Sequence, residues 1–388
     1  MTSEWRTIRA ADFIDFNPRL SLKKGDIATK VAMDKLKPFT KKIPETEKAE
    51  FNGGAKFCNG DTVMARITPC LENGKTAYVD MLDDGEIGFG STEFIVMRAK
   101  TGISDPQFVY YTAINPVFRN VAIKSMVGSS GRQRVQQSVL EELELSVPDL
   151  DEQRRIGDFL ARIDEKIALN DRINDNLQQQ AFSVFDNLIA NAENNDYTVS
   201  DYAFLNPKRT LAKNQVARSI DMSQLSTSGA FPSGWEMKPF NGGMRFTNGD
   251  TLLARITPCL ENGKTAFIDF LDDGEVAFGS TEYIVLAPKN DTPPEMLYCL
   301  ARYPAFVDYA VKNMNGSSGR QRVSAETVGQ YRLPLFDKHS LVLFKEVVSP
   351  MFLKMRYNSL ENMRLAELRD ALLPKLMSGE IDVSAVQL

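Results

Sequence analysis

The chain has 388 residues, of which 43% are hydrophobic and 25% charged, and its formal net charge is −5 at pH 7. This length accommodates two domains with separate cores, and the composition is that of a folded protein rather than a disordered one. The net charge excludes a uniformly basic coat for nucleic acid, although a local basic patch is compatible with it. No run of about 18 apolar residues occurs and residues 1–10 lack an apolar signal core, so we expect a cytoplasmic protein without a membrane span.

Histidine and cysteine usage narrows the chemistry. His339 is the only histidine, which excludes Ser-His-Asp and Cys-His catalysis and histidine-rich metal sites. The four cysteines, Cys58, Cys70, Cys259 and Cys299, form no close pair with metal-ligand spacing. We therefore expect reduced thiols and no metal site.

The chain is a tandem repeat. Residues 51–97 recur without a gap at 240–286, a shift of 189 positions. The same shift relates Asn17-Pro18 to Asn206-Pro207 upstream. Two copies of one globular unit, separated by helical sequence, indicate a molecule that reads two similar features at a fixed separation.

The first copy begins with strand patterns and continues with helix. Short apolar runs at 62–67 and 93–97, with Asn-Gly and Asp-Gly turns between them, predict strands. A helical segment is expected at 106–124, and its counterpart in the second copy at 294–312. Each copy is therefore predicted to be an α+β domain of about 150 residues.

A heptad pattern follows each copy and predicts a long helix with a coiled-coil seam. The first seam consists of Leu160, Ile163, Ile167, Asn170, Asn174, Leu177, Ala181, Val184 and Leu188. The second consists of Leu341, Phe344, Val348, Met351, Met355, Asn358, Asn362, Leu365 and Leu372. Pro350 is expected to kink or interrupt the first turns of the second helix.

The seams share a pair of asparagines. Asn170 and Asn174 correspond to Asn358 and Asn362 with a shift of 188. Polar seam residues fix the register of coiled coils at some cost in stability, so these four are predicted to set the register of the helices. The alternative is that they face solvent on a slightly overwound helix.

Because each helix follows its own globular unit, an approximate two-fold axis is expected to relate the two halves of the chain, with the helices antiparallel. A helix of about 40 residues spans roughly 60 Å. That length exceeds one turn of DNA, roughly 34 Å, so the helices are predicted to act as a ruler between two readers.

The most chemically specific motif is Gly-Ser-Ser-Gly-Arg-Gln-Arg-Val at 128–135, which recurs at 316–323. Glycines let the backbone approach a phosphate, serine hydroxyls and main-chain amides donate to it, and arginine or glutamine reaches base edges with paired donors. The alternative is an ordinary loop whose arginines are solvated or paired with carboxylates. The predicted DNA contacts are Ser129, Ser130, Arg132, Gln133, Arg134, Ser317, Ser318, Arg320, Gln321 and Arg322.

The repeated block around Thr-Pro-Cys-Leu-Glu-Asn-Gly supplies weaker candidates for DNA contact, which are Arg66, Lys75, Arg255 and Lys264. The alternative here is an internal ion pair of each arginine with Glu72 or Glu261. Identity between repeats can also reflect a need of the fold or a recent duplication.

The candidate enzyme motifs are incomplete or occur in only one of the two copies. Of Gly85, Gly88 and Gly90, the second copy replaces Gly88 by Ala277, so a cofactor loop is not indicated. Asn17-Pro18 lacks the second proline and aromatic of adenine methyltransferases. Asp149 and the 164–166 segment mimic a nuclease spacing but have no counterpart in the second copy. We therefore expect no catalytic residue in this chain.

Over nearly its whole length the chain resembles the specificity (S) subunits of type I restriction-modification systems. The resemblance is carried by segments 60–75, 90–94 and 279–283, by the Pro148 to Ile156 string Pro-Asp-Leu-Asp-Glu-Gln-Arg-Arg-Ile, and by the segment 368–381. It implies an α+β fold with two tandem target-recognition domains and two long antiparallel coiled-coil spacer helices in pseudo-two-fold symmetry. The implied divisions are recognition domains at 1–150 and 196–336, spacer helices at 151–195 and 337–377, and a tail at 378–388.

The resemblance also implies partners. The chain would bind double-stranded DNA, position two adenine methyltransferase subunits and accept restriction subunits. It would have no catalytic site and no cofactor of its own, with S-adenosylmethionine, ATP and Mg on the partner subunits. The alternative reading is a stand-alone bipartite DNA-binding regulator.

The two copies are more alike than the dissimilar recognition domains common in this family. The same half-site read on opposite strands would give a near-palindromic target. Differences such as Lys56 against Arg245, Cys58 against Thr247, and the stretches 37–50 against 226–239 could make the halves unequal.

Overall fold

The computed structural model describes residues 5–129, 131–192, 196–317, 319–383 and 386. The chain divides into two compact units, which we call unit 1 (1–168 and 365–388) and unit 2 (169–364). The boundary passes through both long helices, so each unit contains a piece of each helix.

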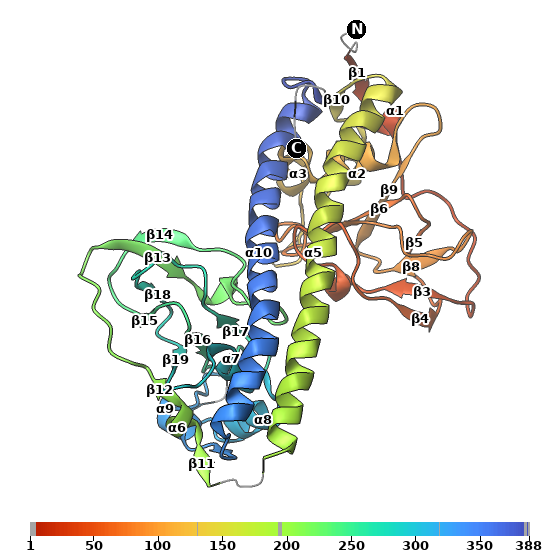
Figure 1. The fold of residues 1–388 in the computed structure, drawn as a ribbon. Coiled ribbons are helices and arrows are strands. Elements are labelled where there is room, and N and C mark those ends of the chain that lie inside the picture. Colours follow the sequence, from red (N-terminus) through yellow and green to blue (C-terminus); the bar gives the residue numbers. More distant parts are fainter. Residues whose placement is uncertain (1–4, 130, 193–195, 318, 384–385, 387–388) are drawn as a thin grey trace. The chain divides into compact units, whose positions relative to one another are not determined.

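The described part of unit 1 contains two four-stranded sheets and one two-stranded sheet (Figure 1). The strand orders are β2-β9-β6-β7 and β4-β3-β8-β5, and β1 pairs with β10. These strands are β1 (Arg6–Arg9), β2 (Ile14–Phe16), β3 (Ile27–Val31), β4 (Glu47–Glu50), β5 (Ala55–Phe57), β6 (Thr62–Ala65), β7 (Thr76–Tyr78), β8 (Gly88–Gly90), β9 (Phe94–Ala99) and β10 (Glu144–Val147).

Unit 2 repeats this topology, with orders β12-β19-β16-β17 and β14-β13-β18-β15, and with β11 paired to β20. The register also repeats, because Thr62 lies opposite Met97 and Thr251 lies opposite Leu286. The strands are β11 (Tyr197–Thr198), β12 (Ala203–Leu205), β13 (Val216–Ile220), β14 (Glu236–Pro239), β15 (Met244–Phe246), β16 (Thr251–Ala254), β17 (Thr265–Phe267), β18 (Ala277–Gly279), β19 (Tyr283–Pro288) and β20 (Arg332–Leu333). The tandem repeat of the sequence is therefore a repeat of fold.

The helices are mostly short, apart from two of about 40 residues. They are α1 (Ala10–Phe13), α2 (Pro106–Ile114), α3 (Pro116–Lys124), α4 (Gln137–Glu141), α5 (Leu150–Ala190), α6 (Val199–Tyr202), α7 (Pro294–Arg302), α8 (Pro304–Lys312), α9 (Ala325–Gly329) and α10 (Lys338–Met377), with 3₁₀ turns at η1 (Met33–Lys35) and η2 (Met222–Gln224). Among the described residues, none of these helices is long and apolar enough to cross a membrane.

The helical segment expected at 106–124 is two helices. Asn115 ends α2, and its side chain then accepts a hydrogen bond from the Val117 amide and caps α3. Pro116 occupies the first position of α3, where its missing N–H costs nothing. Unit 2 breaks at the same place, before Pro304.

The expected interruption at Pro350 is wrong, because α10 is helical from Lys338 to Met377. Pro350 is exposed, whereas the seam residues Phe344, Val348 and Met355 around it are buried. Packing of that apolar stripe compensates for the backbone hydrogen bond that proline cannot make.

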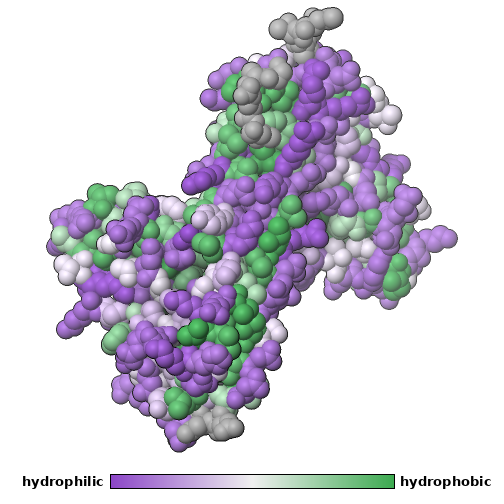
Figure 2. All heavy atoms as spheres, viewed as in Figure 1, coloured by the Kyte–Doolittle hydropathy of each residue, from purple (hydrophilic) through white to green (hydrophobic). Residues whose placement is uncertain are grey.

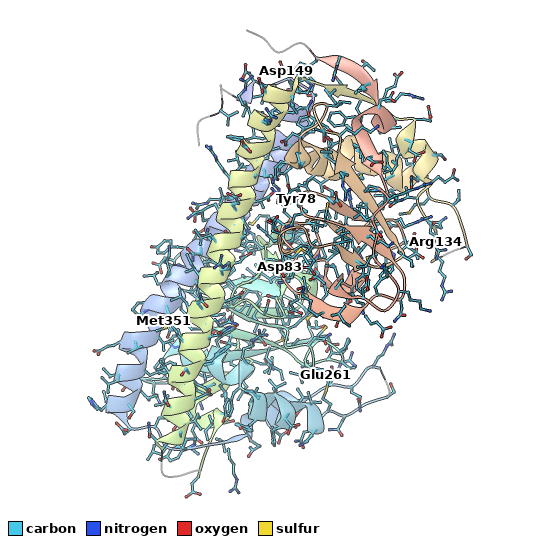
Figure 3. The ribbon with its side chains drawn as sticks, turned by 90° about the vertical axis from the view of Figure 1, so that its right-hand side faces the viewer. Tyr78, Asp83, Arg134, Asp149, Glu261 and Met351 are labelled. Carbon is cyan, nitrogen blue, oxygen red and sulfur yellow. The ribbon has the colours of Figure 1, made fainter. Side chains whose placement is uncertain are left out.

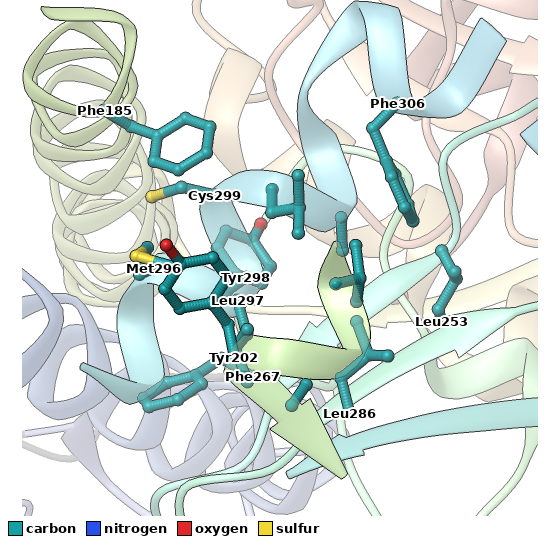
Figure 4. Close-up of a cluster of buried hydrophobic side chains, with 14 of the residues drawn as sticks. Phe185, Tyr202, Leu253, Phe267, Leu286, Met296, Leu297, Tyr298, Cys299 and Phe306 are labelled. Carbon is teal, nitrogen blue, oxygen red and sulfur yellow. The ribbon is translucent and has the colours of Figure 1, made fainter. Parts of the chain in front are cut away.

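Each unit has its own core, formed where one sheet packs against helices. In unit 2, the buried face of β16, β17 and β19 meets α7, α8 and both long helices. Figure 4 shows this cluster, in which Phe185 of α5 lies near Cys299 of α7. The equivalent core of unit 1 includes Leu373 and Leu376, so the end of α10 belongs to it.

Within each unit the two long helices run antiparallel. In unit 2, Asn170 contacts Asn362 while Asn174 contacts Asn358. The predicted α+β class with long coiled-coil helices is thereby confirmed. The domain boundaries expected from the sequence stay predictions.

Candidate nucleic-acid interface

The loop at 128–134 is a closed finger in unit 1. Val127 and Arg134 exchange backbone hydrogen bonds of 3.0 and 2.9 Å across its base. The base is then tied to the segment that follows β6, because the Thr68 amide donates to the Gln133 carbonyl at 3.0 Å and the Val135 amide donates to the Arg66 carbonyl at 2.8 Å. The loop is therefore anchored by main-chain bonds, whatever its side chains do.

Unit 2 builds the same finger. Asn315 and Arg322 exchange backbone bonds of 2.9 Å, and the Thr257 amide donates to the Gln321 carbonyl at 3.0 Å. Glycine is required at the first turn: Gly316 has φ of 131°, and a Cβ there would lie 3.0 Å from the Arg320 carbonyl oxygen. The retained motif thus has a conformational reason as well as a chemical one.

The second arginine of each finger is held by a glutamate. Arg134 donates to both carboxylate oxygens of Glu93, with Nε distances of 2.9 Å and an Nη2 distance of 2.5 Å. In unit 2, Arg322 clasps Glu282 in the same way at 2.9, 2.9 and 2.6 Å. Figure 3 labels Arg134 of the unit 1 finger.

The glutamate also faces the arginine at the end of β6. Arg66 Nε lies 3.9 Å from Glu93, and Arg255 Nε donates to Glu282 at 3.3 Å. The hydrogen bonds from Arg134 lower the pKa of Glu93, and those from Arg322 lower the pKa of Glu282. Both carboxylates are therefore charged at neutral pH.

The first arginine and the glutamine of each finger are the available donors. Arg132 and Arg320 are exposed, and neither guanidinium has a hydrogen-bond or ion-pair partner within the described chain. Ser129 and Ser317 are exposed on the same fingers. The predicted contacts Ser130 and Ser318 lie outside the described residues.

Residues 3–179 match the family model described as the type I restriction modification DNA specificity domain. This part of the chain is a type I DNA specificity domain. Over 405 aligned residues the chain is 24% identical to the type I restriction enzyme HindI specificity subunit of Haemophilus influenzae, covering 83% of this chain and 86% of that protein. It is 34% identical over 134 residues to the EcoAI specificity subunit of Escherichia coli, covering 34% of this chain and 21% of that protein.

The fold has a solved counterpart in the type I restriction-modification S subunit from M. genitalium. That structure aligns with a TM-score of 0.56 at 17% identity, and the alignment covers 96% of each chain. The resemblance to specificity subunits predicted from the sequence is therefore confirmed, and the fold extends it beyond the matched specificity domain.

The two lysines predicted as weaker DNA contacts are held inside the fold. In the specificity domain, Lys75 donates to the carbonyl of Met33 at 2.9 Å. Lys264 donates to the carbonyl of Met222 at 2.7 Å. Each lysine contacts the 3₁₀ turn that follows a strand, so a structural role accounts for its retention. Its contact with DNA stays a prediction.

Sequence reasoning missed the glutamates that organise the fingers. It offered Glu72 and Glu261 as partners of the arginines, whereas the structure uses Glu93 and Glu282. The available signal was the Ser-Thr-Glu string retained in both repeats. Its serine hydroxyl accepts from the glutamate amide at 3.1 Å in each unit, which fixes the carboxylate.

The seam asparagines form a cross-helix network in unit 2. Asn170 Nδ2 donates to Asn362 at 2.9 Å, Asn358 Nδ2 donates to Asn174 at 2.8 Å, and Asn362 Nδ2 donates to Asp171 at 2.8 Å. Asn170 and Asn358 are buried, and their side-chain oxygens accept no hydrogen bond from the residues that the structure describes. The solvent-facing alternative is therefore excluded for these two, while their effect on register stays a prediction.

Proposed function

We propose that the chain is the DNA specificity subunit of a type I restriction-modification complex, with each unit reading one half of a bipartite target. The observation that carries this proposal is the paired finger: two backbone-anchored loops of one sequence, each presenting beside a glutamine an exposed arginine that has no partner among the described residues. Arginine pairs with guanine and glutamine with adenine through two donors or acceptors at once, so this pair suits base readout in the major groove.

The two arginines of each finger have different proposed roles. Arg134 and Arg322 position the finger through their glutamates, while Arg132 and Arg320 contact DNA. Because the fingers are identical in sequence, the half-sites they read are proposed to be similar, and the target is close to palindromic. The asparagine network of the long helices is proposed to set the separation of the half-sites.

The chemistry is proposed to reside on partner subunits. An adenine methyltransferase subunit would bring S-adenosylmethionine, and restriction subunits would bring ATP and Mg. An apolar strip on α10 in unit 2 supports a partner: Leu343 and Val347 are 47% and 46% exposed, and a cavity of about 640 Å³ lies between them and α5. Figure 2 shows hydrophobic side chains gathered along this part of the helix. Exposed apolar surface of this kind is typical of protein interfaces.

The primary test is a map of N6-methyladenine in host DNA, with the chain present, deleted, or substituted. A bipartite methylated motif that disappears with the chain is expected. Arg132→Gln and Arg320→Gln should each relax the motif on one side only, because each bidentate contact contributes about 1–3 kcal/mol to discrimination. Lys75→Gln is the matched control and should leave the motif unchanged in a folded chain. Two unrelated half-sites would refute the near-palindrome, and an unchanged methylation map would refute the function.

The partner surface has its own test. Leu343→Glu should prevent co-purification of the methyltransferase subunit, since it places a charge in the apolar strip. Lys345→Glu lies two residues further along α10, on another face, and should leave the complex intact. Equal recovery of the methyltransferase with both variants would exclude this strip as its seat.

A further inference from the structure

A cavity of about 580 Å³ lies beside the finger in unit 1. Arg66 lines it, as do Thr92 and Phe94 on either side of the glutamate that holds Arg134. Its volume is in the range of small-ligand pockets. The cavity and the finger therefore share one edge of the unit.

The cavity is cationic. Arg19, Lys56 and Arg66 line it, and none of the described residues that line it carries a carboxylate. Lys56 Nζ donates to the Leu20 carbonyl at 2.9 Å and retains further donors, since an ammonium group has three. Arg66 Nε is buried, lies 3.9 Å from Glu93 and makes no hydrogen bond among the described residues. The Arg66 side chain as a whole is 32% exposed, so its other guanidinium donors are open to an incoming anion.

Unit 2 keeps a cation at the three equivalent positions, Lys208, Arg245 and Arg255, but differs at two other positions of the wall. Met244 stands where unit 1 has Ala55, and Arg209 stands where unit 1 has Leu20. Arg209 is drawn to the buried Asp250, to which it donates at 2.7 Å. Arg255, the counterpart of Arg66, already donates to Glu282. The small residue at the cavity wall and the longer arginine–glutamate contact, 3.9 Å for Arg66–Glu93 against 3.3 Å for Arg255–Glu282, are thus features of unit 1.

We propose that the unit 1 cavity seats a phosphate of the DNA backbone, held by Arg19, Lys56 and Arg66. Unit 1 therefore grips its half-site through a phosphate that unit 2 does not bind in the same way. This inference rests on the proposed DNA-reading function. Phosphate contacts fix the position of a protein on DNA without reading sequence, so the two units can read similar bases while binding with unequal strength.

The repeat supplies a matched pair of substitutions to test this. Ala55→Met fills the unit 1 cavity with the residue that unit 2 carries, and Met244→Ala is the reverse change in unit 2. The full-length chain, assembled with its methyltransferase, is titrated with duplexes that contain or lack the mapped target. Ala55→Met should weaken binding to both duplexes about tenfold and reduce the slope of log K against log salt by about 0.9, the value for one phosphate. Met244→Ala should bind as the wild type does.

A second variant and a chemical probe protect the test from a folding artefact. Lys56→Gln removes one charge without filling the cavity and should give the same loss of slope. In target duplexes with single neutral methylphosphonate linkages, one position in the unit 1 half-site should weaken the wild type but not Ala55→Met. Wild-type affinity in both variants would overturn the phosphate seat while leaving the proposed function standing. Loss confined to one base pair would overturn it in favour of base readout, and failure of the wild type to select the target would overturn both.

Discussion

Where the long helices pack on the rest of each unit, unit 1 has a buried ion pair and unit 2 has apolar residues at the same positions. In unit 1, Asp164 of α5 accepts hydrogen bonds of 2.6 Å from both Arg369 of α10 and the hydroxyl of Tyr111. Lys41 is buried beside them and donates to that hydroxyl at 3.3 Å. The side chains of Asp164 and Arg369 are only 6% and 8% exposed, so a full ion pair is buried here.

At the equivalent repeat positions, unit 2 replaces these four residues with small or apolar ones. Ala230, Cys299, Phe352 and Ala181 correspond to Lys41, Tyr111, Asp164 and Arg369, with shifts of 188 or 189. All four belong to one apolar core. The backbone does not change with them, because the carbonyl of residue 41 accepts from the Tyr78 amide and the carbonyl of residue 230 accepts from the Phe267 amide.

The four residues at this position are therefore exchanged together between the two units. A buried ion pair gives little net stability over an apolar cluster, but removing one member leaves an uncompensated charge. Each junction is internally consistent, and a mixture of the two would not be. This buried ion pair does not determine the fold, since unit 2 folds the same way with an apolar cluster in its place.

The largest expected effect comes from breaking the polar set at one member. Asp164→Ala should lower the free energy of unfolding by about 3–5 kcal/mol, because Lys41 stays buried and Arg369 keeps only the largely exposed Asp370 as its carboxylate partner. Urea denaturation of the full chain measures this loss. Copying unit 2 into unit 1 with Lys41→Ala, Tyr111→Cys, Asp164→Phe and Arg369→Ala together should restore most of it. A quadruple variant no more stable than Asp164→Ala would contradict the exchange as a set.

A second break concerns a buried aspartate whose arginine comes from a different place in each unit. Asp61 is paired by Arg98 of β9 at 2.7 Å, whereas its counterpart Asp250 is paired by Arg209, from the loop after β12. Arg98→Ala should destabilise the chain by about 3 kcal/mol, since the Asp61 side chain is 1% exposed. Adding Leu20→Arg, the arrangement of unit 2, should recover part of that loss in thermal melts. Failure of this rescue would show that the two pairings are not interchangeable.

The pH dependence of stability distinguishes the buried Lys41 of unit 1 from Ala230, its counterpart in unit 2. Burial lowers the pKa of Lys41 from 10.5 to about 8, so the unfolded chain binds more protons than the folded one between these values. Stability contributed by this group therefore rises with pH from about 8 to 10.5, by up to about 1 kcal/mol per pH unit, and its cost is fully present below 8. Lys41→Met should flatten the profile in that window, as followed by urea midpoints. Ala230→Gly in unit 2 is the control and should not change its shape.

The smallest expected effect is on the seam of unit 2, where Asn170 and Asn358 are buried between the two long helices. Asn170→Leu with Asn358→Leu should raise stability by about 1 kcal/mol while loosening the register of the helices. The spacing between methylated half-sites should then become heterogeneous in the N6-methyladenine map. An unchanged spacing, together with unchanged affinity and solubility, would count against a register role.

Much of this architecture was readable from local pattern. The repeat, the Asn-Gly and Asp-Gly turns and the seam predicted two similar α+β units and two long helices, because these signals depend on residues close in sequence. Pro116 and Pro350 show that local sequence rules for proline hold at one position and not at another. The first proline separates two helices, while the second lies exposed within a helix that its packed stripe sustains.

The candidate interface was predicted only in part. The finger motif was evident, but the distinction between Arg132 and Arg134 depends on Glu93, which lies 41 residues from Arg134. Asp164 was dismissed as a chance match to a nuclease spacing, and its partner Arg369 lies 205 residues away. Contacts at such separations leave no periodic trace in a single chain.

The sequence by itself determined that this protein consists of one fold built twice with helices attached, because repeats, turn residues and seams act through neighbouring positions. Only the tertiary structure decided which charged residues are committed within the fold and which are available to DNA. An arginine paired with a carboxylate and an arginine facing solvent are identical in the sequence. Only burial and the distances between side-chain atoms distinguish them.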